Sequence, residues 1–430
     1  MRPAFAMPTT KVNSVWVIGL GRQYPQYSIT QDQFADLIMR LYPEACATPT
    51  VQKLLRVNKS TKIFSRPTIF DQSTWTKDDA AAPAIDELSH IFRTLGVDLT
   101  VAACNKAIKE ARITPIDITH VVAVTCTDQG SPGYDLFVSH KLQLRPGVQR
   151  SLLHGVGCAG GLSALREAAN LAVAASSRRQ PARILVFATE LCSLFLRAEL
   201  KAAFQNSGVL NIAPLLFSDG SAASVVCNGI ALAEKQRPIY EIQEYDSAIL
   251  TGTQSHMSYN VSPKGMLVTI TKDVPKATVA AVGPMFSQVC STKNASVDPK
   301  AYDWAVHPGG ASILQGVQEA MGLSDNQIRA SLDVYHKFGN SSSPTVLIVL
   351  DKLRHMGRGK DNVIATSFGP GLMIEMCRMT RCRDAESEQE KRPGLLFKAH
   401  RLCMSLTPSL FRLNKTKQMG VGGVNTSKRL

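Results

Sequence analysis

Several features that mark other classes of protein are missing from this chain of 430 residues. No uncharged apolar run approaches the roughly 18 residues that a membrane-spanning helix needs. No basic segment followed by an apolar one and a small-residue cleavage site marks a secretory leader. We therefore expect a globular protein without a membrane-spanning helix that stays in the cytosol.

The cysteine and histidine spacing of metal sites is also missing. The ten cysteines are scattered, no Cys-x-x-Cys pair occurs, and no histidine cluster has ligand spacing. Several cysteines stand inside apolar runs, as Cys227 does after Val225 and Val226, which does not resemble a disulfide framework. The sequence therefore predicts neither a bound metal nor a disulfide scaffold.

A basic run interleaved with aromatic residues, which is typical of nucleic-acid binding, is absent as well. The net charge of +14 nevertheless suggests an anionic partner. Residues 381–430 hold 11 basic and 4 acidic side chains and so carry half of that charge. We expect no nucleic acid as partner, a phosphorylated ligand for the body of the chain, and weak contact of the basic tail with a membrane surface.

What the chain does contain is an alternation of apolar runs with longer stretches at helical spacing, which is typical of mixed α/β layers. The predicted strands are 15–19, 120–125, 183–189, 222–227, 266–271, 304–306 and 362–366. The predicted helices are 31–41, 84–95, 101–111, 160–175, 275–289, 311–321, 325–335 and 345–355.

One arrangement occurs twice: an apolar strand, a Gly-rich turn with a reactive residue, and an Ala-rich helix. The first turn begins at Cys158 and the second at His307. A duplicated βα framework would place both turns beside a shared cleft. We therefore expect an N-terminal half over 1–232, a C-terminal half over 233–382, and a basic, flexible extension over 383–430.

Cys158 is the first candidate for chemistry. It stands in the segment 155–161 (GVGCAGG), directly before a helical pattern. The small residues permit a tight turn that brings the thiol to a helix N-terminus, where the dipole favours the thiolate. The alternative is a buried structural cysteine.

His307 is the second candidate, because an apolar strand ends in this histidine and the chain then turns at once. Such a side chain can present one ring nitrogen to a cleft. The alternatives are a hydrogen-bonded core histidine at this position, or His154 as the functional histidine. Asn340 is the third candidate, in the segment 338–344 (FGNSSSP); its amide can donate to an oxyanion or belong to a helix cap.

Together these residues resemble the type III polyketide synthases of the chalcone and stilbene synthase family. The resemblance covers roughly residues 12–380. It rests on five motifs in the family's order: the turn around Cys158, LFSDG at 216–220, AVHPGG at 305–310, GNSS at 339–342 and FGPGL at 368–372.

The resemblance implies an α/β, thiolase-like αβαβα five-layer fold and a homodimer. It also implies a catalytic triad of Cys158, His307 and Asn340, with an ion pair between the thiolate and His307. Cys158 would take an acyl group from acyl-CoA, and decarboxylation of malonyl-CoA would supply the enolate that extends it. No cofactor or metal is implied beyond the CoA thioester substrates.

The resemblance further assigns Lys53, Arg56 and Lys59 to the phosphates of CoA. They share a predicted helical face, and a solvated basic face is the alternative. In the same way it places Phe217 and Val268 as gatekeepers of the cavity, with Phe195, Cys192 and Ser342 also lining it. Val268 stands where plant enzymes often have Phe, which would widen the cavity, whereas Phe195 would narrow the initiation pocket.

The basic tail and Val268 favour a fungal-type enzyme that uses fatty acyl starters to make alkylpyrones or alkylresorcinols. One alternative is an initiating ketoacyl-ACP synthase, although such an enzyme typically has His-Gln-Ala-Asn where this chain has HPGG at 307–310. Another is a non-catalytic thiolase-fold lipid-binding protein.

Overall fold

The computed structural model describes residues 13–383, apart from 206–210, 235, 292–294 and 358. The strands are β1 (Val15–Gln23), β2 (Tyr27–Thr30), β3 (Ser65–Thr68), β4 (His120–Val124), β5 (Gln149–Leu153), β6 (Arg183–Leu191), β7 (Asp219–Asn228), β8 (Tyr240–Ile249), β9 (Met257–Ser262), β10 (Gly265–Ile270), β11 (Tyr302–Val306), β12 (Asn362–Gly369) and β13 (Met373–Arg381). The helices are α1 (Gln31–Leu41), α2 (Pro49–Ser60), α3 (Ile85–Ile91), α4 (Val97–Ala111), α5 (Tyr134–Lys141), α6 (Gly160–Ser177), α7 (Leu196–Gln205), α8 (Ala213–Leu216), α9 (Val274–Val289), α10 (Ala311–Met321), α11 (Arg329–Phe338) and α12 (Thr345–Leu353).

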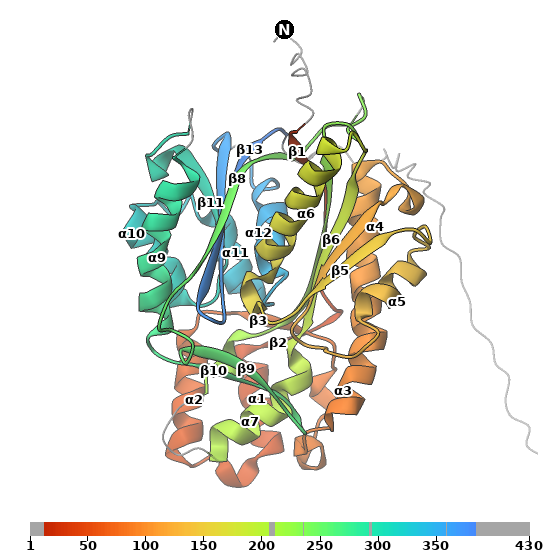
Figure 1. The fold of residues 1–430 in the computed structure, drawn as a ribbon. Helices are drawn as coiled ribbons and strands as arrows, with labels where there is room; N and C mark the ends of the chain where they lie inside the picture. Colours follow the sequence, from red (N-terminus) through yellow and green to blue (C-terminus); the bar gives the residue numbers. More distant parts are fainter. Residues whose placement is uncertain (1–12, 206–210, 235, 292–294, 358, 384–430) are drawn as a thin grey trace, which may run out of the picture. The chain divides into compact units, whose positions relative to one another are not determined.

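Among the described residues, nine strands form one sheet in the order β11-β12-β13-β8-β1-β7-β6-β4-β5. The sheet has two halves, because β1 pairs with β7 along its length but with β8 only from Val15 to Val17. Helices α6 and α12 lie between the two halves (Figure 1), and their side chains share one hydrophobic core with both.

Two further cores cover the outer faces of the sheet. One packs α4 and α5 on the N-terminal half, and the other packs α9 and α10 on the C-terminal half. Strand β4 illustrates the alternation: Val122 and Val124 belong to the central core, whereas Val121 and Ala123 belong to an outer one. The order helix, sheet, helix, sheet, helix confirms the predicted five-layer αβαβα fold.

Two glycines of β1 allow α4 to lie directly on the sheet. A Cβ atom at Gly19 would come within 2.1 Å of the Ala107 carbonyl oxygen, and one at Gly21 within 2.2 Å of the Ala103 oxygen. A larger residue at either position would push the helix away, so these glycines set the spacing of this layer.

The predicted elements differ from the observed ones in two ways. First, the predicted helices 84–95 and 101–111 form one continuous helical stretch, because a short π-helix over Phe92–Gly96 joins α3 to α4. Second, several elements were not predicted: β2, β3, β9, α5, α7 and α8, and three strands of the main sheet, β5, β8 and β13. Charged residues interrupt their apolar runs, and in β13 the buried Glu375 is neutralised by Arg166 of α6 at 2.9 Å.

The reactive turns predicted from the sequence both follow parallel strands. Cys158 lies between β5 and α6, and His307 lies at the end of β11. Because the carboxyl ends of parallel strands are where α/β proteins place their ligands, this end of the sheet is the expected site. The smaller elements α1, α2, α7 and the hairpin β9–β10 gather beyond this end (Figure 1).

Within the described ranges, no helix combines the length and the apolar character needed to cross a membrane. The same ranges contain no cluster of three or more His, Cys, Asp or Glu side chains that could hold a metal ion. The predicted extension over 383–430 lies outside the described residues, except for Arg383.

Candidate active site

The turn that carries Cys158 is held in place by close backbone packing. Gly157 has a φ of +48°, and a Cβ atom there would lie 2.5 Å from Cδ of Pro370. A Cβ atom at Gly161 would lie 2.4 Å from the Ser343 carbonyl oxygen. The glycines around Cys158 therefore bring together three segments that are far apart in the sequence: its own turn, the one at 339–343 and the one at 368–372.

Cys158 has two polar neighbours from the Asn340 segment. Its Sγ donates a hydrogen bond to Ser342 Oγ at 3.3 Å, and Asn340 Nδ2 donates to Sγ at 3.9 Å. Asn340 Oδ1 accepts the Ser342 backbone N–H at 2.7 Å, which orients the amide so that its nitrogen faces the sulfur. The side chain of Asn340 does not cap α12, whose N-cap position is Pro344.

His307 is buried, with 1% of its surface exposed, and its backbone N–H donates to the Thr366 carbonyl at 2.8 Å. Neither ring nitrogen has a hydrogen-bond partner among the described residues, which argues against a hydrogen-bonded core histidine. No hydrogen bond links His307 to Cys158 within those residues. The competing histidine, His154, is exposed and its Nδ1 contacts the Thr125 carbonyl oxygen at 3.0 Å.

Burial disfavours the charged forms of both the Cys158 thiol and the His307 imidazole. It raises the pKa of the Cys158 thiol to about 11, against the lowering effect of the hydrogen bonds with Ser342 and Asn340. Burial also lowers the pKa of His307 to about 3. An isolated thiolate or an isolated imidazolium is therefore disfavoured here, and transfer of the thiol proton to His307 is the step that would create both charges together.

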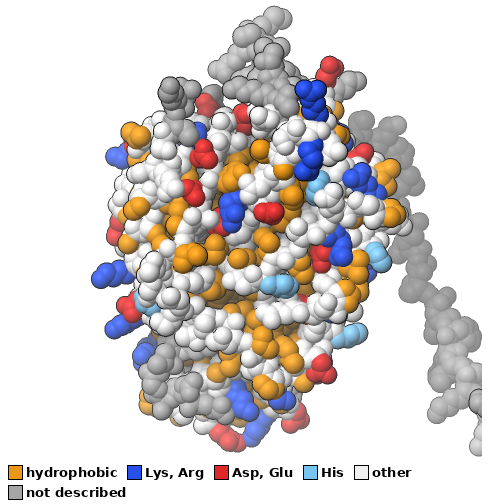
Figure 2. All heavy atoms as spheres, viewed as in Figure 1, with side chains coloured by type: hydrophobic (Ala, Val, Ile, Leu, Met, Phe, Trp, Pro, Cys, Tyr) orange, Lys and Arg blue, Asp and Glu red, His pale blue; other side chains and the backbone are white. Residues whose placement is uncertain are grey.

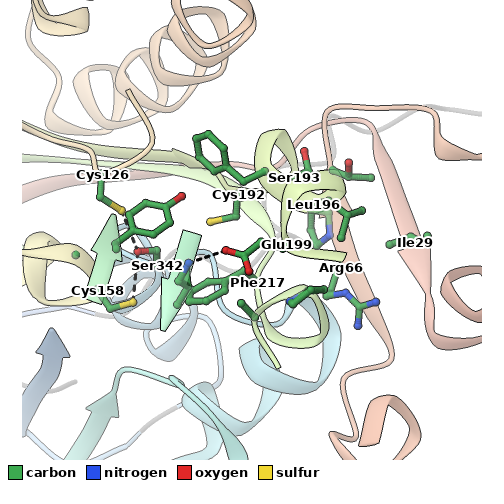
Figure 3. A pocket seen from close by; sticks show the side chains of 18 of the residues that line it. Ile29, Arg66, Cys126, Cys158, Cys192, Ser193, Leu196, Glu199, Phe217 and Ser342 are labelled. Carbon is green, nitrogen blue, oxygen red and sulfur yellow. Dashed lines mark hydrogen bonds between the residues drawn. The ribbon is translucent and has the colours of Figure 1, made fainter. Parts of the chain in front are cut away.

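A cavity opens at Cys158 (Figure 3), with about 810 Å³ of empty space when the open solvent at its mouth is included. All five predicted pocket residues line it together with Cys158, namely Phe217, Val268, Phe195, Cys192 and Ser342. His307 and Asn340 are not part of this lining. Phe217 is tied to Asn340 by a backbone bridge, because the Asn340 N–H donates to Leu216 and its carbonyl accepts from Ser218, both at 2.9 Å.

Lys53, Arg56 and Lys59 lie on α2 and are all exposed, while Val51, Leu54 and Asn58 form the buried face of that helix. None of the three basic residues lines the cavity. The structure thus places them on a solvated face that is free to meet a charged ligand.

Several residues of the site were not predicted from the sequence. Glu190 is fully buried and accepts hydrogen bonds from the Cys126 backbone N–H and from Ser343 Oγ. The sequence does contain a sign of Glu190, because an acidic residue inside the apolar run 183–191 indicates a buried carboxylate. Glu199 and Arg66 line the cavity but stand in ordinary polar surroundings in the sequence, so nothing local distinguished them.

Comparisons with known proteins agree with this geometry. The family model described as "Chalcone and stilbene synthases, N-terminal domain" matches residues 6–229, and the model of the C-terminal domain matches residues 241–382. The type III polyketide synthase pspB of Penicillium soppii is 42% identical over 386 residues, covering 86% of this chain and 96% of that protein.

The acylalkylpyrone synthase csyB of Aspergillus oryzae is 35% identical over 390 residues, covering 87% of this chain and 97% of that protein. The crystal structure of a type III pentaketide synthase from Neurospora crassa matches with a TM-score of 0.81 and 38% identity, covering 85% of this chain and 99% of that one. The chain therefore belongs to the chalcone and stilbene synthase family of type III polyketide synthases, which are acyltransferases.

Proposed function

We propose that this chain loads an acyl group from acyl-CoA onto Cys158, extends it repeatedly with malonyl-CoA, and releases a pyrone- or resorcinol-type product. The observation that carries the proposal is the thiol of Cys158, which lies beside Ser342 and the Asn340 amide on the wall of a cavity. A nucleophile of this kind needs a base, and His307 supplies an imidazole whose ring nitrogens have no other partner among the described residues.

In the loading step, His307 accepts the thiol proton as Sγ attacks the thioester carbonyl. The bond from that carbon to the CoA sulfur then breaks, and His307 returns the proton to the departing CoA thiolate. In the extension step, malonyl-CoA loses CO₂, and the Asn340 amide and His307 donate hydrogen bonds to the enolate oxygen. The enolate carbon attacks the acyl carbonyl carbon on Cys158, and the bond from that carbon to Sγ breaks, which leaves the lengthened chain as a CoA thioester. Sγ then attacks this thioester as in the loading step, CoA is released, and the chain is back on Cys158 for the next cycle.

A pyrone-type product is favoured by the likeness to a protein named acylalkylpyrone synthase. Fatty acyl starters are favoured by the lining of the cavity, to which Ile29, Phe34, Phe195 and Leu196 contribute apolar surface. The initiating ketoacyl-ACP synthase and the non-catalytic lipid-binding protein are not favoured, because both family models and the named relatives point to polyketide synthases.

The proposal is tested by incubating the purified chain with labelled malonyl-CoA and a panel of acyl-CoA starters. We expect release of CO₂, an acyl adduct on Cys158 in the intact-protein mass, and cyclised products in mass spectrometry. Absence of both CO₂ release and adduct across the whole panel would rule the proposal out.

Replacing Val268 by Phe should shorten the longest starter that the enzyme accepts. Val268 lines the cavity, and the added ring would occupy space that an acyl chain needs. The measurement is the product profile across acyl-CoA starters of increasing length. Leu267→Phe is the matched control, because Leu267 is the neighbour in β10 and is not part of the lining. An unchanged length limit in Val268→Phe would contradict the gating role.

Removing the three cations of α2 together, as Lys53→Ala, Arg56→Ala and Lys59→Ala, should raise KM for CoA thioesters about tenfold with little change in kcat. The effect should shrink at high salt, since exposed charges are screened. Lys109→Ala changes an exposed cation of α4 and serves as control. Equal KM values for the triple variant and the parent would assign these residues to an ordinary solvated surface.

We further propose a homodimer in the cytosol that needs no cofactor or metal. Dimerisation is supported by apolar side chains on the outside of the fold, among them Val173 of α6, 41% exposed, and Ile249 of β8, 78% exposed. Figure 2 shows hydrophobic side chains interspersed on the face where these two elements lie. Sedimentation of the full chain as a monomer would contradict the proposed dimer.

The division of the chain at residues 232 and 382 and the membrane contact of the tail stay predictions.

A further inference from the structure

The cavity wall carries one group that the loading and extension steps do not use. Among the described residues that line the cavity, Glu199 of α7 is the only carboxyl group, and it is 4% exposed. Figure 3 shows its side chain near Cys192 and Phe217, in the interior of the cavity. A carboxyl group in a largely apolar pocket costs folding free energy, so a role in the reaction is worth testing.

Two N–H donors fix this carboxyl group. Oε1 accepts the backbone N–H of Val268 at 2.7 Å, and Oε2 accepts the side-chain amide of Asn211. A carboxylate oxygen has two lone pairs, so one acceptor position remains on each oxygen. Neither donor carries a charge. The group is thus held rigidly without being neutralised by a cation, since no ion pair of Glu199 occurs among the described residues.

The surroundings also place the titration of Glu199 in the physiological range. Burial raises its pKa to about 7, against the lowering effect of the hydrogen bonds from Val268 and Asn211. Arg66 lines the same cavity, and among the described residues it forms no ion pair with Glu199. The titratable groups that interact electrostatically with Glu199 are Cys192, directly after β6, and Tyr259 of β9. Burial raises the pKa of both well above the usual values, so both are neutral where Glu199 changes charge.

Resting on the proposed function, the geometry points to Glu199 as the general base of ring closure on the poly-β-keto chain. The enol O–H of the chain gives its proton to the Glu199 carboxylate, and the enol oxygen attacks the thioester carbon on Cys158. The new C–O bond closes the pyrone ring as the C–S bond breaks. The sulfur leaves as thiolate and is reprotonated, so the net reaction moves one proton from the enol oxygen to Cys158 and uses no other reactant.

The decisive variant is Glu199→Gln, which keeps an oxygen for the Val268 N–H but has no basic carboxylate. We expect loading of Cys158, followed by intact-protein mass, to stay within about twofold of the parent, while release of pyrone falls about 100-fold. Extended chains should then accumulate as thioesters on Cys158. Pyrone release at the parental rate would overturn the inference. An equal loss of loading and release would also overturn it, because Glu199 would then only maintain the structure of the cavity wall.

A second variant tests the same role through pH. Asn211→Ser removes a donor that stabilises the carboxylate, while the serine hydroxyl can still accept the Ala213 N–H that Asn211 now binds at 3.0 Å. The pKa of Glu199 should rise, so less carboxylate is present at a given pH and the acid limb of pyrone release shifts up by about one unit. Asn260→Ser on the exposed part of β9 is the control.

An acid limb that stays in place in Asn211→Ser would also overturn the inference. These outcomes are separate from a failure of the proposed function, because that failure would show as the absence of any acyl adduct on Cys158 in the unaltered protein.

Discussion

Replacing Cys158 by alanine should lower polyketide formation by at least about 1,000-fold and abolish the acyl adduct. The thiol is the group that carries the growing chain, and alanine removes it with little change in volume. Product formation is measured with a starter and malonyl-CoA, and the adduct by intact-protein mass. Thermal unfolding of the variant should stay close to that of the parent, because its loss of packing is a single sulfur atom.

The two other thiols of the cavity are the matched controls. Cys126 and Cys192 line the same cavity, and burial raises the pKa of both well above that of a free thiol. Unlike Cys158, neither receives a hydrogen bond from the Asn340 amide among the described residues. Cys126→Ala and Cys192→Ala should therefore keep the adduct. An adduct that persists in Cys158→Ala and disappears in one of these variants would assign the nucleophile to another residue.

The parts of the site that could be predicted are those whose chemistry is local in the sequence. The turn around Cys158 combines small residues with a following helix, and His307 ends an apolar strand; both patterns have physical reasons that involve only neighbouring residues. The five predicted pocket residues came instead from the resemblance to a known family, and the structure places all five on the wall of one cavity.

What could not be predicted depends on contacts between distant segments. The approach of Gly161 to Ser343 brings Ser342 to the thiol, and the sequence contains no sign of that pairing. Glu199 is held inside the cavity by N–H groups of Val268 and Asn211, which are distant from it in the sequence. Its helix alone is an ordinary amphipathic one, in which an acidic residue predicts a solvent-facing side chain.

The missed strands have a related cause. Strand β8 carries Glu241, Glu244 and Asp246 between apolar residues, and half-buried side chains there leave no continuous apolar run. In β13, Glu375 would be costly inside a sheet without Arg166, which approaches from α6. In β13, charge compensation from another layer of the fold therefore makes the buried acid tolerable, and no short stretch of the sequence contains both partners.

Replacing His307 by glutamine should make Cys158 far less reactive near neutral pH. Glutamine cannot accept the thiol proton, and the hydrogen bonds with Ser342 and Asn340 only partly offset the burial that raises the thiol pKa to about 11. A raised thiol pKa means that the thiolate fraction is small below that pH and grows about tenfold per pH unit. Alkylation of Cys158 by iodoacetamide, followed by intact-protein mass, should fall at least about 100-fold at neutral pH and recover as the pH rises.

The pH dependence of the same alkylation in the parent decides whether the predicted ion pair exists. If proton transfer to His307 creates the thiolate, the rate in the parent should be nearly independent of pH around neutrality, because thiolate and imidazolium titrate as one pair. Ser342→Ala is the control: it removes the hydrogen bond at 3.3 Å but leaves the imidazole, so its profile should keep the flat region. A parent profile that rises as steeply as that of His307→Gln would mean that the free enzyme holds a neutral thiol. In that case His307 would remove the proton only as the sulfur attacks the substrate.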